Sequence, residues 1–139
     1  MNLPVQVYPS RLEGKVQAPP SKSYTQRALL ASLLAGGKNE IILPGNSEDE
    51  QHMLENIRHL GARLSHAQDR WIIQGGMPST TTTRELDVGE SGLGMRLIVP
   101  TAALLEQTTT ITGSGSLKKR PMKTFEHILT QAGAHCQTN

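Results

Sequence analysis

With 139 residues, the chain is long enough to form one ordinary domain with a buried core. Its net charge of +2 and its aromatic content of 3% argue against binding to single-stranded nucleic acid, which needs basic grooves and stacking platforms. The single cysteine, Cys136, excludes an internal disulfide, and the five histidines show no metal-ligand spacing. We therefore expect an aliphatic core and no metal site.

The N-terminal segment has no basic stretch followed by a long apolar run, so it does not resemble a signal peptide. The longest apolar stretch, residues 28–35, is too short to span a bilayer. We expect a cytoplasmic protein without membrane contact. Alternation over Leu3–Tyr8 predicts a strand, and residues 16–18 form a second extended piece that ends at Pro19.

Two helices are predicted in the first half of the chain. Ser21 or Ser23 caps the first, which continues to Ala35, ends at Gly36 and is apolar on almost every side, so we expect it to be buried. The second begins at a capping box over residues 47–50 and ends near residue 61. Strands are expected at 40–43, 62–65 and 70–74, and the last two are predicted to pair as a hairpin.

The second half begins after a linker rich in Pro, Ser and Thr at 77–83. A strand is expected at 85–88, then a Gly-rich turn at 89–94, a helix to Leu105 kinked by Pro100, a strand at 108–112 and a turn at 113–116. A last helix starts near Pro121. Its predicted apolar face consists of Met122, Phe125, Ile128, Leu129 and Ala132.

The two halves are similar to each other. Residues 60–64 match residues 132–136, and both halves follow the order strand, turn, helix, strand, helix, with a further strand only in the first. A repeat that stops within its unit predicts that the natural protein continues beyond Asn139.

Basic residues lie where three helices begin, at Lys22 and Arg27, at Arg96, and at residues 118–120. A cation at a helix N-terminus costs roughly 0.3–1 kcal/mol because it opposes the helix dipole. An anionic ligand would offset this cost, and the glycine-rich turns would let backbone amides approach it. The pattern therefore predicts a site for a small, multiply anionic molecule, although residues 118–120 alone are more typical of a solvated surface run than of a ligand site.

Three segments resemble the motifs of the enolpyruvylshikimate-phosphate synthase family. Residues 18–30 are similar to its P-x-S-K-S signature followed by x-x-R-A-L-L, residues 89–96 to G-N-A-G-T-x-x-R, and residues 113–121 to G-x-x-R-M-x-x-R-P. The resemblance implies an α/β (α+β) fold of βαβαββ units, the inside-out α/β barrel, of which this chain would hold about two of the three units of one domain. Residues 1–18 would be a strand segment shared with the other domain, 19–76 the first unit and 84–139 the second, incomplete unit.

The resemblance also implies a function. The family transfers the enolpyruvyl group of phosphoenolpyruvate to the 5-hydroxyl of shikimate 3-phosphate and releases phosphate, with no metal or organic cofactor, on the route to chorismate and aromatic amino acids. Lys22 would be the catalytic residue that contacts both substrates. The substrate-binding residues carried over or suggested by the motifs are Lys22, Ser23, Arg27, Gly92, Arg96 and Arg120.

Three positions depart from the family pattern. Glu90 replaces an Asn, Leu93 replaces a Thr, and Ser116 stands where the family has an Arg that binds phosphoenolpyruvate. A carboxylate at Glu90 would repel this substrate unless it turns away or pairs with a cation. One of the cations at 118–120 could substitute for the missing Arg.

Other functions remain open at this stage. A transferase acting on UDP-N-acetylglucosamine is disfavoured because that family carries its reactive cysteine on a loop, whereas Cys136 follows a helix in a strand position. A non-catalytic anion-binding homologue is the second alternative. The acidic residues that move protons in the family are not in this chain, so we expect the chain alone to be inactive. The intact enzyme is expected to be a monomer, and self-association of this part is left open.

Overall fold

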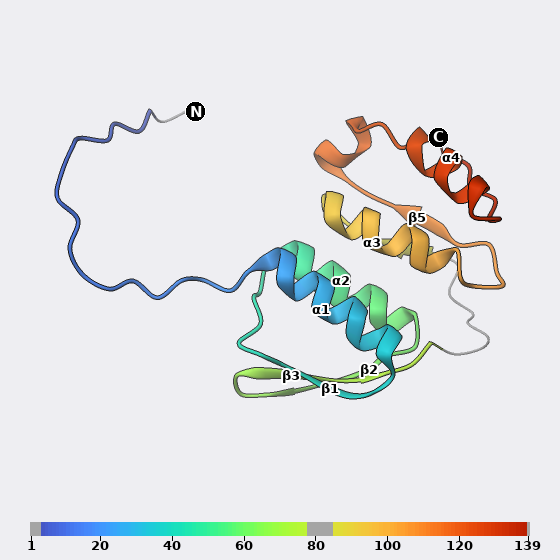
Figure 1. The fold of residues 1–139 in the computed structure, drawn as a ribbon, viewed down its shortest axis with the longest axis horizontal. Coiled ribbons are helices and arrows are strands. Elements are labelled where there is room, and N and C mark those ends of the chain that lie inside the picture. The colour runs from blue at the N-terminus through green and yellow to red at the C-terminus, as the bar shows by residue number, and fades with distance from the viewer. Residues whose placement is uncertain (1–3, 78–84, 139) are drawn as a thin grey trace.

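The computed structural model describes residues 4–77 and 85–138 as a mixed α/β arrangement (Figure 1). Two helices cover a three-stranded sheet in the first half, and two further helices accompany a strand pair in the second. The elements in chain order are α1 (Lys22–Ala35), β1 (Gly37–Ile42), α2 (Glu48–His59), β2 (Arg63–Ala67), β3 (Arg70–Gly75), β4 (Glu85–Asp87), α3 (Gly92–Ala102), β5 (Thr110–Thr112), the 3-10 helix η1 (Gly115–Lys119) and α4 (Lys123–Gln131).

The N-terminal segment extends away from the helices as an arm (Figure 1). Residues 4–21 are exposed and form no strand, so the prediction of a strand at Leu3–Tyr8 is wrong for its described part, residues 4–8. A strand needs a hydrogen-bonded neighbour, and no described segment lies alongside the arm to supply one. Sequence alternation alone could not reveal this missing partner.

The sheet of the first half has the order β1-β3-β2, and both pairings are antiparallel. The predicted hairpin between β2 and β3 is confirmed, with Leu64 opposite Ile73. The central strand β3 carries Trp71, which is 7% exposed, and His66 of β2 meets its ring edge-on with centroids 6.2 Å apart.

The helices α1 and α2 lie side by side on this sheet (Figure 1). The capping box at the start of α2 is confirmed, because Glu50 N donates to Ser47 Oγ at 3.4 Å and Ser47 N donates to Glu50 Oε2 at 2.8 Å. Helix α1 ends before Gly36 as predicted, and Ser21 occupies its N-cap position without a side-chain cap.

The core is aliphatic, and α1 contributes to it through one side only. Leu29 and Leu33 are fully buried, but Leu34 is 49% exposed and Ala31 and Ala35 are exposed, so the expectation that α1 is buried all round is wrong. The sheet, α2 and α3 cover one side of α1, and nothing in the described chain covers the other.

In the second half β4 and β5 pair in parallel, with α3 as the crossover between them. Helix α3 contains Pro100 and ends at Ala102, earlier than predicted, and η1 forms where a plain turn was expected. The predicted apolar face of α4 is covered in part: Leu129 is buried, Met122 and Phe125 are half-buried against the core, and Ile128 is 53% exposed. The predicted linker lies, beyond Met77, outside the described residues.

The order of helices and strands agrees with the predicted order from α1 onward. The division into units at 19–76 and 84–139 stays a prediction. Within the described residues, no helix is long and apolar enough to cross a membrane.

Candidate functional site

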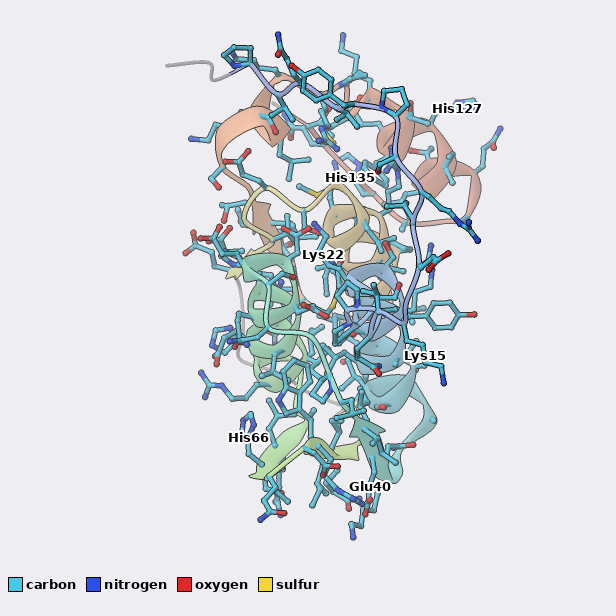
Figure 2. All side chains as sticks on the ribbon, turned by 90° about the vertical axis from the view of Figure 1, so that its left-hand side faces the viewer. Lys15, Lys22, Glu40, His66, His127 and His135 are labelled. Atoms are coloured by element: carbon cyan, nitrogen blue, oxygen red, sulfur yellow. The ribbon has the colours of Figure 1, made fainter. Side chains whose placement is uncertain are left out.

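Lys22 lies in the first turn of α1, beside the start of α2. Its Nζ is 2.9 Å from Asp49 Oδ2, and its side chain is 53% exposed. The hydrogen bond to Asp49 and the charge of that carboxylate raise the pKa of Lys22 above its ordinary value, so the ammonium stays protonated at neutral pH. In Figure 2, Lys22 lies midway between the sheet, marked by Glu40 and His66, and the C-terminal region with His127 and His135.

Ser23 and Arg27 follow on the exposed side of α1. Their spacing of four residues places them one above the other, and Arg27 Nη1 donates to the Ser23 carbonyl oxygen at 3.0 Å. The guanidinium thus folds back on its own helix, where its remaining donors face solvent.

The start of α3 gathers three of the predicted site residues. Ser91 caps the helix by accepting a hydrogen bond from Gly94 N at 2.9 Å, which leaves Gly92 as the first helical residue. A Cβ at Gly92 would collide with Arg120 Nη1 and lie 3.8 Å from Arg96 Nη1. Two guanidinium groups therefore lie next to a helix start that has no side chain in the way.

A buried hydrogen bond connects these two groups of residues. Ser91 Oγ donates to Gln26 Oε1 at 3.1 Å, and both side chains are at most 1% exposed. Gln26 comes one turn after Lys22, so the bond fixes the start of α3 against the first turns of α1. Gln26 was not among the predicted site residues, although its position in register with Leu29 and Leu33 is a signal in the sequence for a buried polar side chain.

The position of Glu90 answers one question left by the sequence. Its Oε2 accepts a hydrogen bond from Ser116 N at 2.9 Å. Hydrogen bonds from the backbone and hydroxyl of Ser116 lower the pKa of Glu90 below its ordinary value. Burial and the negative charge of Asp49 raise this pKa by less than the Ser116 bonds and the positive charge of Arg120 lower it. The ionised carboxylate therefore points to the segment after β5 and bonds to the backbone of Ser116.

Of the three cations at 118–120, Arg120 is the one that the structure places at Gly92. A hollow of about 210 Å³ lies beside it, open to solvent, between α3 and the segment after β5. Its lining residues are Met95, Gly113, Leu117, Lys118, Arg120 and Met122.

The site is therefore cationic, with two guanidinium groups at the start of α3. Among residues 4–77 and 85–138, no group of three or more His, Cys, Asp or Glu side chains could hold a metal ion. The ammonium of Lys22 and the guanidinium groups of Arg96 and Arg120 suit phosphate and carboxylate oxygens. A small molecule with more than one anionic group fits this arrangement best.

The family model and the relatives that match this chain all belong to one enzyme family. The model of the family described as EPSP synthase (3-phosphoshikimate 1-carboxyvinyltransferase) matches residues 7–139. The 3-phosphoshikimate 1-carboxyvinyltransferase of Methanocorpusculum labreanum is 38% identical over 130 residues, which cover 90% of this chain and 30% of the relative. The enzyme of the same name from Methanocaldococcus jannaschii is 40% identical over 124 residues, 87% of this chain and 29% of the relative.

The likeness extends to the fold. A solved EPSP synthase from Acinetobacter baumannii superposes with a TM-score of 0.79 at 27% identity, over 91% of this chain and 29% of that one. The chain spans about 30% of the length of the curated relatives that it matches. On these matches, the chain belongs to the EPSP synthase (3-phosphoshikimate 1-carboxyvinyltransferase) family.

Proposed function

We propose that these residues form part of the substrate site of an enzyme that transfers the enolpyruvyl group of phosphoenolpyruvate to the 5-hydroxyl of shikimate 3-phosphate, releasing phosphate. The observation that carries the proposal is the family match over residues 7–139, joined with a cationic site built from the matching motifs. Because the chain spans about 30% of its relatives, the reaction is proposed for the whole gene product, and this chain supplies binding and positioning.

Each site residue has a distinct role in this proposal. Lys22, paired with Asp49 and protonated, is proposed to neutralise anionic oxygens of both substrates. Ser23 and Arg27, on one exposed side of α1, bind shikimate 3-phosphate, with Arg27 released from its own helix.

The start of α3 receives phosphoenolpyruvate in the same proposal. Gly92 allows close approach to backbone N–H groups, while Arg96 and Arg120 supply positive charge. Cations and amides that are fixed before reaction stabilise charge as the tetrahedral intermediate forms, and they do so without reorganising. The Gln26–Ser91 bond keeps the two halves of the site in register.

The test is phosphate release from shikimate 3-phosphate plus phosphoenolpyruvate, measured on the whole gene product. Lys22→Ala is expected to lower turnover on the order of a hundred-fold, the usual effect of removing one charged donor from a transition-state site. Lys38→Ala is the matched control, because Lys38 also pairs with a carboxylate, Glu40 at 3.2 Å, but lies in the sheet.

Three results would contradict the proposal. Equal turnover of Lys22→Ala and Lys38→Ala would remove Lys22 from the site. Binding of shikimate 3-phosphate without turnover by the unmodified protein would favour the non-catalytic homologue. Turnover with UDP-N-acetylglucosamine in place of shikimate 3-phosphate would assign the chain to the other substrate class.

A further inference from the structure

Two positions that depart from the family motifs contact each other in the structure. The loop at 88–91 and the segment at 113–120 follow the carboxyl ends of the parallel strands β4 and β5, so they leave the sheet at the same edge. Ser114 N donates to the Gly89 carbonyl oxygen at 2.8 Å, and Ser116 N donates to Glu90 Oε2 at 2.9 Å. The second bond joins the two departures, Glu90 and Ser116.

Glycines allow the two segments to come this close. Gly115 has φ of +48°, and a Cβ there would collide with the Glu90 carboxylate. A Cβ at Gly113 would lie 3.1 Å from the Gly89 carbonyl oxygen. Larger side chains at these two positions would push the segment away from α3.

The bonded segment carries Arg120 at its end. Leu117, 2% exposed, anchors its middle in the core, and Arg120 N donates to the Leu117 carbonyl oxygen at 3.0 Å. Arg120 then returns toward α3 and places its guanidinium against Gly92. Contacts at Ser114, Ser116 and Leu117 therefore decide where this cation lies.

We propose that Glu90 is a positioning residue, whose carboxylate holds the segment 113–120 against α3 so that Arg120 stays beside Gly92 and receives an anionic group of the ligand. The inference rests on the proposed function and adds a role for a residue that would otherwise repel the substrate. Because the Glu90 carboxylate accepts the backbone N–H of Ser116, it supports the anion site and does not compete with it.

The test uses the 15N-labelled chain with Glu90→Ala and Glu90→Gln. Alanine removes the acceptor of the Ser116 bond, whereas glutamine keeps an acceptor oxygen at the same reach and removes the charge. The matched control is Glu126→Ala, since Glu126 Oε1 also accepts a backbone N–H, from Thr138 at 2.6 Å, but belongs to α4.

Two readouts are compared. The first is direct: Glu90→Ala is expected to speed hydrogen exchange at the Ser116 amide and to remove the nuclear Overhauser contact between Arg120 and Gly92, and Glu90→Gln should retain both. The second is a titration with inorganic phosphate, in which Glu90→Ala should bind roughly five- to ten-fold more weakly, as for the loss of one hydrogen bond, and Glu90→Gln close to the unmodified chain.

Several outcomes would overturn the inference. An Arg120 contact that survives in Glu90→Ala would show that other residues hold the segment. Tighter phosphate binding by Glu90→Gln would show that the carboxylate competes with the ligand, and an absence of phosphate binding in every variant would remove the anion from Arg120. A titration of the unmodified chain and of Lys22→Ala with shikimate 3-phosphate separates the two proposals, because binding that depends on Lys22 tests the proposed function alone.

Discussion

Replacing Asn56 by alanine should loosen the connection between the two halves of the chain. Asn56 lies on α2, is 2% exposed, and its Nδ2 donates to the carbonyl oxygen of Asp87, the last residue of β4, at 2.8 Å. The substitution removes this bond, leaves a carbonyl with one partner fewer and opens a small void. A lost hydrogen bond of this kind costs about 1 kcal/mol, and an unsatisfied buried acceptor raises the cost to roughly 2–3 kcal/mol.

Urea unfolding measures this loss. With a slope of about 1–3 kcal/mol per molar, a loss of ~2 kcal/mol lowers the midpoint by about 0.7–2 M while the slope stays the same. Gln51→Ala is the control on the same helix, because Gln51 is exposed and its side chain, in the described contacts, bonds only to Asn46, at 2.6 Å. Its effect should stay within about 0.5 kcal/mol.

The part of the chain that loses stability in Asn56→Ala is also predicted. Since Asn56 contacts β4, hydrogen exchange should increase more in β4 and β5 than in the sheet of the first half. Equal midpoints for Asn56→Ala and Gln51→Ala would refute the reasoning. A lowered midpoint with faster exchange only in the first half would show that the bond to Asp87 does not join the halves.

Two further predictions concern Glu50 and Gly92. Burial raises the pKa of Glu50, but hydrogen bonds from Ser47 and Thr25 and the charge of Lys22 outweigh it, so the pKa lies below the ordinary 4.5. The ionised Glu50 therefore stabilises the fold above pH 4.5, and this stabilisation is lost as the pH falls through the lower folded-state pKa. The difference in unfolding free energy between the unmodified chain and Glu50→Gln should become smaller on acidification. A difference that does not change with pH would contradict this prediction. Gly92→Ala should leave the melting temperature nearly unchanged, because the added Cβ displaces only the tip of the Arg120 side chain. The same substitution should weaken phosphate binding on the order of ten-fold, measured by calorimetry. An unchanged affinity would show that Arg120 does not bind the anion at Gly92.

Local signals were sufficient to predict several elements. The capping box at Ser47 depends on residues within one turn, and the end of α1 is set by Gly36, so both could be located from the sequence. The hairpin of β2 and β3 follows from two short strands joined by a tight turn. In each case the interacting residues are close in the chain.

Features that depend on distant neighbours could not be predicted in this way. The arm at 4–21 and the uncovered side of α1 were misjudged because apolar content does not say which partner covers a surface. The Glu90–Ser116 bond spans 26 residues, so the sequence left open whether Glu90 turns away or pairs. Arg120 was among the expected binding residues, but its place beside Gly92 depends on the path of η1 and could not be predicted.

The strand order β1-β3-β2 also bears on how this chain folds. The strand β3, last of the three in the sequence, is the one to which the other two bond, so β1 has no sheet partner until residue 70 and beyond are available. The adjacent β2–β3 hairpin can form within microseconds, whereas docking of β1 closes a longer loop and follows later. Trp71, the only tryptophan in the chain, lies in β3 between both partners. Its fluorescence therefore records the assembly of this sheet without any introduced label.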